Sequence, residues 1–130
     1  MGSFVMGFDR FKIHTLQQLD QVARKSVLEV FKGIIMDTPV KSGRARGNWQ
    51  GTIGAPASGE LEVEDPSGSK TISAMQAQVL AWKAITGVSI LLTNNVPYIG
   101  RLNGGSSTQT PARFVERNVM RVGGIVQEAV

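Results

Sequence analysis

The sequence predicts an α+β fold in which a small antiparallel sheet packs against a long N-terminal helix and a C-terminal helix. Apolar residues recur at helical spacing over 15–36, short alternating or β-branched runs fill the middle, and a second helical run follows residue 110. The links between them have hairpin length, which favours an antiparallel sheet. With 130 residues, we expect one domain over 15–130, preceded by a flexible arm over 1–14.

The run over 15–36 predicts a helix roughly 30 Å long, at about 1.5 Å per residue. Thr15 and Gln18 form a capping-box pattern at its start. Apolar residues at steps of three and four mark one stripe of this helix, and polar residues mostly fill the other face. The stripe consists of Leu16, Leu19, Val22, Ala23, Val27, Val30, Phe31, Ile34 and Ile35.

Residues 38–49, called the elbow below, follow this helix directly. A proline cannot continue the helix, and two glycines allow positive φ. Two arginines are expected to point outward, and a tryptophan re-enters an apolar pattern. The elbow is therefore predicted to be a rigid basic link from helix to strand, better suited to docking than to catalysis. Its defining residues are Pro39, Gly43, Arg44, Arg46, Gly47 and Trp49.

Two short strands are predicted next, over 49–53 and 61–65, with a turn-rich connection between them. In the second, apolar and acidic residues alternate, which is the period of a half-buried strand. Charge on the exposed face is a common protection of an edge strand. The acidic residues here are Glu60, Glu62, Glu64 and Asp65.

The second half of the chain predicts a helix over 71–86 and an apolar, β-branched central strand over 88–93. Gly87 is a plausible residue to end the helix. A short returning strand is expected over 98–102, followed by an exposed loop over 103–109.

The C-terminal helix is predicted to start at Thr110 and Pro111, a cap followed by a proline in the first helical position. The glycine pair at 123–124 is expected to weaken its last turns. Its apolar side consists of Phe114, Val115, Val119, Val122 and Val126.

Composition excludes several classes of protein. A hydrophobic content of 42% supports an ordinary core. No apolar run approaches the about 20 residues of a membrane helix, so we expect no membrane contact. The chain has no cysteine, which excludes disulfides and thiolate metal sites. The net charge of +4 is compatible with nucleic acid or an acidic protein as partner, and equally with an ordinary solvated surface.

No group of residues predicts catalysis. His14 is the only histidine, and no triad can be built around it. The stretch 68–71 lacks the glycine spacing of a phosphate loop and fits a turn before a helix. The acidic strand could hold a divalent ion, but a solvated edge or a charged interface explains it better. We therefore expect no catalytic residue, no cofactor and no metal.

Arginines offer two candidate contact surfaces. In the last helix they step by four and so share one face, which either faces solvent or meets an acidic surface in an oligomer. Under the second reading, charge reversal at Arg117 loosens assembly in a salt-dependent way. Arg44 and Arg46 beside Trp49 form either a structural elbow, which we favour, or a basic-aromatic patch for nucleic acid. The stepped residues are Arg113, Arg117 and Arg121.

Three stretches in order resemble the tail-completion or neck proteins (minor tail protein Z-like) of tailed bacteriophages. They are Thr-Pro-Val-Lys-Ser-Gly-Arg at 38–44, Asn-Asn-Val-Pro-Tyr at 94–98 and Pro-Ala-Arg-Phe-Val at 111–115. The resemblance covers roughly residues 16–122 and singles out Pro39, Gly43, Pro97, Tyr98, Pro111 and Phe114, to which the pattern adds Trp49. The chain departs from the family where Ser42 replaces threonine, where Ile99 replaces alanine, and where an acidic residue is missing before Gly104.

The resemblance implies a structural virion protein with no enzymatic activity, made in the host cytoplasm, that forms a homo-oligomeric ring in the neck and joins head connector to tail. Its partners would be other copies of itself and connector, tail-terminator or tail-tube proteins, with DNA only passing through. Subunits in a ring meet through different patches. The candidate interface residues are Arg44, Arg46, Glu60, Glu62, Glu64, Arg113, Arg117 and Arg121. The alternative is a small basic nucleic-acid-binding module.

Overall fold

The computed structural model describes residues 16–121, so the predicted N-terminal arm, Thr15, His14 and the chain beyond 121 lie outside the described residues. Five helices, a 3-10 turn and two strands are defined in this part of the chain. In order they are α2 (Leu16–Asp37), α3 (Arg44–Gly47), β1 (Gln50–Ile53), α4 (Ser69–Ala81), η1 (Ala84–Thr86), β2 (Ile90–Thr93), α5 (Ile99–Asn103) and α6 (Phe114–Met120).

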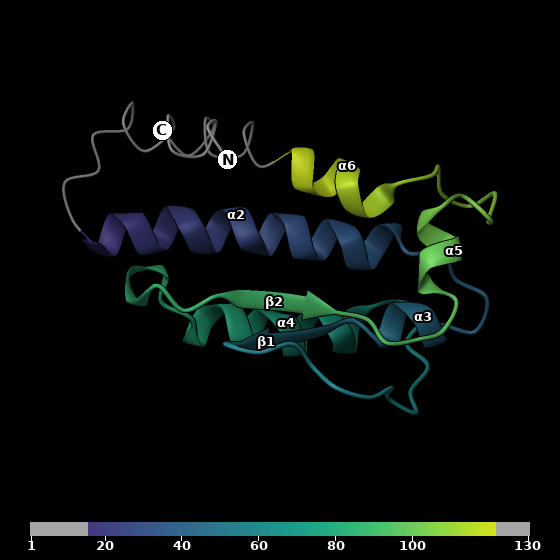
Figure 1. Cartoon of the computed structure of the whole chain (residues 1–130), viewed down its shortest axis with the longest axis horizontal. Helices are drawn as coiled ribbons and strands as arrows, with labels where there is room; N and C mark the ends of the chain where they lie inside the picture. The colour runs from purple at the N-terminus through teal and green to yellow at the C-terminus, as the bar shows by residue number, and fades with distance from the viewer. Residues whose placement is uncertain (1–15, 122–130) are drawn as a thin grey trace.

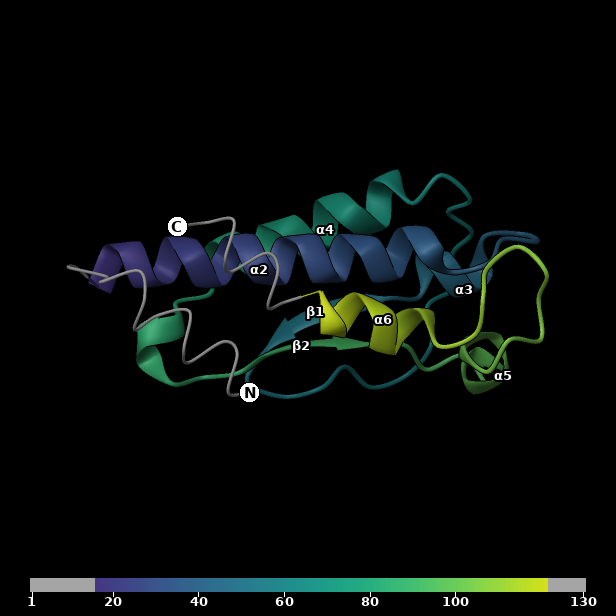
Figure 2. The ribbon, with the colours of Figure 1, turned by 90° about the horizontal axis from the view of Figure 1, so that it is seen from above.

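The fold is α+β, as predicted, with α2 as its longest element. Figures 1 and 2 show α2 along the length of the molecule, with α6 on one side of it and the sheet on the other. Helix α4 packs against both β1 and α2. The core draws on α2, α4 and α6 and on the residue before β1, and the sheet packs against it. It consists of Val30, Ile34, Ile35, Trp49, Met75, Val79 and Phe114.

The sheet consists of β1 and β2, paired antiparallel with Gly51 opposite Leu92 and Ile53 opposite Ile90. Ile90 and Leu92 pack on the core, as the two-residue period of a strand requires. Gly51 lies close to the α4 backbone: a Cβ added to Gly51 would lie 3.6 Å from the Met75 Cα. The strands predicted over 49–53 and 88–93 are confirmed as β1 and β2, but β2 is not central, because β1 is its only partner within residues 16–121.

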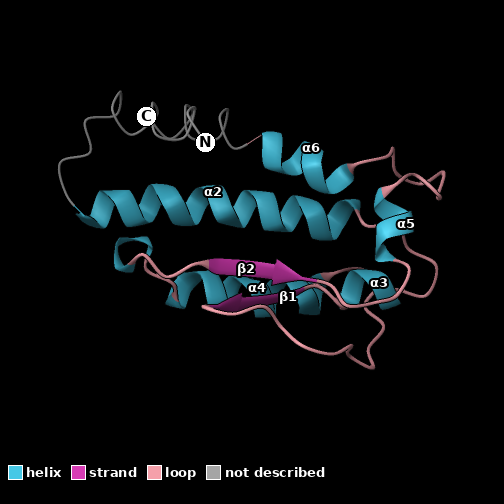
Figure 3. Cartoon of the chain, viewed as in Figure 1, coloured by secondary structure: helices cyan, strands magenta, loops and turns pink. Residues whose placement is uncertain are grey.

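The predicted strand over 61–65 is wrong. Figure 3 draws the whole connection from β1 to α4 as loop. A side chain takes the place of a neighbouring strand: the Asn48 amide accepts from the Leu61 N–H at 2.6 Å and donates to the Leu61 carbonyl at 3.1 Å. The Asp65 N–H then donates to the Gly43 carbonyl at 3.0 Å. This segment is thus extended and bound to the elbow, but it belongs to no sheet.

The predicted strand over 98–102 is also wrong, because this stretch forms the short helix α5. Its backbone closes local bonds, from Ile99 N–H to the Val96 carbonyl and from Leu102 N–H to the Tyr98 carbonyl, both at 3.2 Å. The helix predicted over 71–86 starts earlier, at Ser69, and stops at Ala81. Gly87, with φ 74°, ends η1 instead.

The last helix begins at Phe114, later than predicted. Thr110 does not cap it, since its hydroxyl donates to the Asp37 carbonyl at 2.7 Å. Asn103 serves as the cap: its side-chain oxygen accepts from the Val115 N–H at 3.0 Å. Arg113 enters the helix with φ 63°, an unusual conformation for a residue with a side chain. The start of α6 is therefore set by α5 rather than by its own sequence.

Candidate interaction surface

Arg46 turns into the protein, so the prediction that it points outward is wrong. Its guanidinium donates to the carbonyls of Met36 and Thr38 at 2.8 and 3.0 Å, and to that of Pro66 at 2.6 Å. The last carbonyls of a helix have no partner within it, and a guanidinium can satisfy several at once. Burial lowers the pKa of Arg46, opposed by Asp65 and Asp37. Arg46 thus closes the end of α2 and ties it to the segment before α4.

Trp49 joins the elbow to the core. Its indole N–H donates to the Thr38 hydroxyl at 2.7 Å, and that hydroxyl donates to the Ile34 carbonyl at 2.7 Å. Thr38 and Pro39 are buried as well. The polar atoms that α2 leaves at its end are therefore paired inside the protein, which fixes the direction in which the chain leaves the helix.

Gly43 permits a close approach that another residue would prevent. Its φ is 90°, and a Cβ there would lie 2.4 Å from the Pro66 nitrogen. Its carbonyl accepts the Asp65 N–H, so the backbone around 65–66 rests directly on the elbow. The need for glycine predicted from the sequence is confirmed here, with contact between chain segments as an additional reason.

The second stretch of the resemblance binds the elbow. Asn94 donates to the Ala45 carbonyl in the elbow at 2.8 Å. Asn95 donates to the carbonyls of Ala57 and Gly59 at 3.0 and 2.9 Å, which holds the connection after β1. The two asparagines therefore act as structural links, while Pro97 beside them is exposed.

The third stretch and the loop before it reach the same place. Gln109 makes two bonds to Val40, accepting from its N–H at 2.8 Å and donating to its carbonyl at 2.7 Å. Thr110 binds the end of α2, Pro111 is exposed, and Phe114 is fully buried in the core. The residues directly before the third stretch thus join it to the end of the molecule where the first two lie.

Arg44 is the arginine of the elbow that faces solvent, and its partner belongs to the same chain. It donates to a Glu60 oxygen at 2.7 Å and lies 5.6 Å from the centre of the Tyr98 ring. The hydrogen bond to Glu60 raises the pKa of Arg44. Two residues predicted to face a neighbouring subunit are therefore paired with each other.

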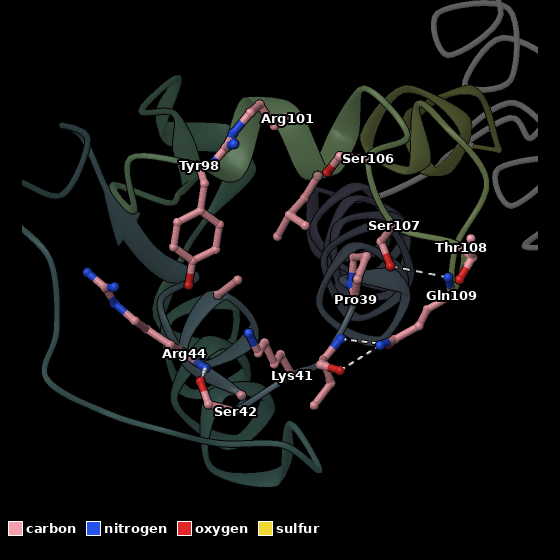
Figure 4. Close-up of a pocket in the computed structure, with 14 residues that line it drawn as sticks. Pro39, Lys41, Ser42, Arg44, Tyr98, Arg101, Ser106, Ser107, Thr108 and Gln109 are labelled. Atoms are coloured by element: carbon pink, nitrogen blue, oxygen red, sulfur yellow. Dashed lines mark hydrogen bonds between the residues drawn. The ribbon is translucent and has the colours of Figure 1, made fainter.

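A groove of about 640 Å³ opens between the elbow and the segment 98–109. Figure 4 shows Tyr98 and Arg101 on one side of it and Arg44 and Lys41 across from them. Hydroxyl groups of the 106–108 loop complete the lining, and no carboxylate lines the groove. Neither Lys41 nor Arg101 has a side-chain hydrogen bond or ion pair within residues 16–121. The groove is therefore cationic; residues 41, 44 and 101 with Tyr98 are called the cationic groove below.

The other predicted interface residues are scattered. Glu62 and Glu64 are exposed and have no ion pair within the described chain. The three arginines do not form a stripe on one helix, because Arg113 precedes α6 and Arg121 follows it. Arg117 donates to the Pro111 carbonyl at 2.9 Å, and Arg121 donates to Asn118 at 2.6 Å.

The sequence reasoning missed the residues that hold this end together: Asn48, Asn94, Asn103 and Asp65. Asp65 had a usable signal, an acidic residue in a turn before a helix. Its carboxylate accepts the Thr71 N–H and hydroxyl, each at 2.8 Å. Burial alone raises the pKa of Asp65, but these hydrogen bonds outweigh it and leave the pKa below its usual value. Asn48 and Asn103 gave no signal, because they bind the backbone of distant residues, Leu61 and Val115. Asn94 stood in the second stretch of the resemblance, which did not reveal its partner Ala45.

Comparison with known proteins found no matching family model, curated protein or solved structure. None of the helices over residues 16–121 has the length and apolar character needed to cross a membrane. Over the same residues, no three histidine or acidic side chains gather as metal ligands would.

Proposed function

We propose that this chain is a structural protein of a tailed-phage virion, without enzymatic activity. It forms a homo-oligomeric ring in the neck or tail-completion region and joins the head connector to the tail. The observation that carries the proposal is that the three resembling stretches and the residues directly beside them meet at one end of the molecule. Arg44 of the first stretch lies over the Tyr98 ring of the second. Bonds of flanking residues add to this contact, from Asn94 to Ala45, Gln109 to Val40, and Thr110 to Asp37.

The way polar side chains are used supports a structural role. Arg46, Asn48, Asn94 and Asn103 each bind backbone groups of another element. Such side chains fix the shape of one end of the molecule and leave few polar groups for chemistry. A shape fixed in this way suits repeated contact between identical subunits, since each contact must close the ring at the same angle.

Exposed apolar side chains provide further contact area. Large apolar residues on a small protein's surface mark protein contact sites when they gather into patches. Here they lie on α4, on α6 and around η1, on both sides of α2. They are Leu80, Ile85, Val88, Val119 and Met120, while Met36, Ile53 and Leu61 are exposed elsewhere. We propose that they meet sister subunits and neighbouring connector, tail-terminator or tail-tube proteins in the assembled virion.

The test is the mass of the purified chain by light scattering, alone and mixed with tail tubes, with electron microscopy of any multimer. We expect a closed ring in one of the two conditions. A chain that stays monomeric, and does not bind tubes or connectors across a range of salt, contradicts the proposal.

The alternative, a basic nucleic-acid-binding module, has less support. It depended on Arg44, Arg46 and the arginines at 113, 117 and 121. Arg44 binds Glu60, Arg46 binds backbone carbonyls, and Arg113 and Arg121 lie outside α6. It predicts DNA binding that falls steeply with salt, since each phosphate contact releases counterions. Titration of duplex DNA at low and moderate salt separates the two proposals.

A further inference from the structure

We infer that the cationic groove receives the acidic segment of a neighbouring copy of this chain. The acidic segment is defined as residues 60–64, which follow the connection after β1. The inference rests on the proposed ring and names the contact between its subunits. It also replaces the contact predicted with the arginines of the last helix.

The first reason is charge. The groove presents Lys41, Arg44 and Arg101, and the acidic segment presents Glu60, Glu62 and Glu64. Within residues 16–121, only Arg44 and Glu60 of these six residues form an ion pair. This leaves two cations and two carboxylates without partners in the described chain. A second copy can supply both, because each copy carries one groove and one segment.

The second reason is that recognition of this kind already occurs in the molecule. Arg44, at the border of the groove, binds a Glu60 carboxylate and stacks near Tyr98. A guanidinium beside an aromatic ring is a favourable site for a carboxylate. Lys41 and Arg101 therefore line the same groove as an arginine–carboxylate pair of the kind that we infer between copies.

The third reason is the backbone of the acidic segment. Glu62, Val63 and Glu64 have no backbone hydrogen bond within the described chain, although Leu61 and Asp65 on either side are bound to the elbow region. The segment is thus held at both ends and free in the middle. Its exposed N–H and carbonyl groups can bond to the hydroxyl groups of the 106–108 loop that line the groove.

The geometry allows a contact from copy to copy. Figure 1 shows α3 and α5 at one end of the molecule, while the connection after β1 loops out on the side of the sheet away from α2. The groove and the acidic segment are different patches that adjoin at Arg44. A contact between the segment of one copy and the groove of the next is therefore head-to-tail, which is the kind that closes into rings.

The experiment compares charge reversals by sedimentation velocity. One variant carries Lys41→Glu and Arg101→Glu, a second carries Glu62→Lys and Glu64→Lys, and a third combines all four. The Arg44–Glu60 pair is left intact, so that contacts of the elbow do not change. The control, Lys25→Glu with Lys32→Glu, makes the same change in net charge as the first variant, at two exposed lysines of α2 outside the groove.

We expect each reversed pair to weaken assembly roughly tenfold or more, because like charges then face each other across the contact. The variant with all four charge reversals should recover most of the lost assembly, and the control should assemble like the unmodified chain. If the unmodified chain assembles and all variants match the control, the inference is overturned while the ring proposal stands. Thermal melting monitored by circular dichroism verifies that each variant is folded.

A synthetic peptide of residues 58–66 tests the groove without assembly. We expect it to bind the full chain and to bind the Lys41→Glu, Arg101→Glu variant much more weakly. Binding by a chain that never forms multimers supports the groove and refutes the ring. Absence of peptide binding to a monomeric chain, or strong duplex DNA binding that depends on the same two residues, overturns the inference.

Discussion

At the scale of single residues, the elbow is built by side chains that bind backbone. Arg46 donates to a carbonyl at the end of α2, and Trp49 donates to the Thr38 hydroxyl. The Asn48 side chain bonds to both the N–H and the carbonyl of Leu61. Each bond of this type contributes about 0.5–1.5 kcal/mol net, but leaving one partner buried and unpaired costs about 1–3 kcal/mol. The residues are therefore hard to replace one at a time.

Gly43→Ala should destabilise the protein by about 3 kcal/mol or more, because positive φ and a clash with the Pro66 backbone act together. Gly87→Ala is the matched control: its φ is 74°, but no atom lies within 4 Å of the added Cβ. We expect it to cost only about 1 kcal/mol. Urea unfolding of both variants measures the difference, and equal losses would show that the close contact adds nothing.

We expect the carboxyl group of Asp65 to account for part of the loss of folding stability in acid. The pKa of Asp65 is lower in the folded protein than in the unfolded chain. The ionised carboxylate therefore stabilises the fold fully above the pKa of the unfolded chain. This stabilisation is lost as the pH falls through the pKa of the folded protein. Asp65→Asn should cost about 1 kcal/mol at neutral pH and weaken the decline in acid. Glu64→Gln, which removes an exposed carboxyl, is the comparison. Unfolding free energies across the acid range measure both, and an unchanged slope in Asp65→Asn would contradict this role.

At the scale of elements, α2 and α6 approach closely at Gly33. An added Cβ there would lie 2.0 Å from the Asn118 side-chain oxygen. Asn118 is buried and donates to the Phe114 carbonyl at 2.7 Å and to Asp37 at 2.9 Å, so it cannot move without losing these bonds. A glycine in the middle of a long helix is thus explained by the neighbouring helix.

Gly33→Ala should destabilise the protein by about 1–3 kcal/mol, despite a gain in helix propensity of about 1 kcal/mol. Gly100→Ala, in the exposed α5 with no atom within 4 Å of the new Cβ, should be neutral or stabilising. Thermal unfolding of the pair checks this. A stabilised Gly33→Ala protein would mean that α6 shifts at no cost.

How well each element could be predicted depends on where its hydrogen bonds go. Helix α2 followed from its apolar stripe, since its bonds are local. The segment 61–65 has the alternation of a strand, but its partner is the Asn48 side chain, which periodicity does not reveal. The start of α6 was misplaced for a similar reason, because Asn103 caps it from another element. For the candidate surface, Arg44 and Glu60 were correctly singled out as charged, but only the structure shows that they pair.

At the scale of the whole molecule, the placement of charge bears on assembly. Arg113 and Arg121 lie outside α6, and Arg117 is bound to the Pro111 carbonyl. We therefore expect Arg117→Glu to disturb assembly less than the reversal of Lys41 and Arg101. Sedimentation velocity at low and high salt compares them, since exposed charge contacts weaken as salt rises. If the Arg117→Glu protein dissociates to the same extent, the arginines near the last helix are part of the interface after all.

The bonds from Gln109 to Val40 and from Thr110 to Asp37 span 69 and 73 positions of the sequence. A nascent chain that still lacks residue 109 cannot form the bonds to Val40 that complete the lining of the groove, even if its helices have already folded. Such distant contacts also cost the most chain entropy and form slowly. In the proposed ring, a truncated chain that stops before residue 109 would therefore lack a complete groove and could not receive the acidic segment of a neighbouring copy.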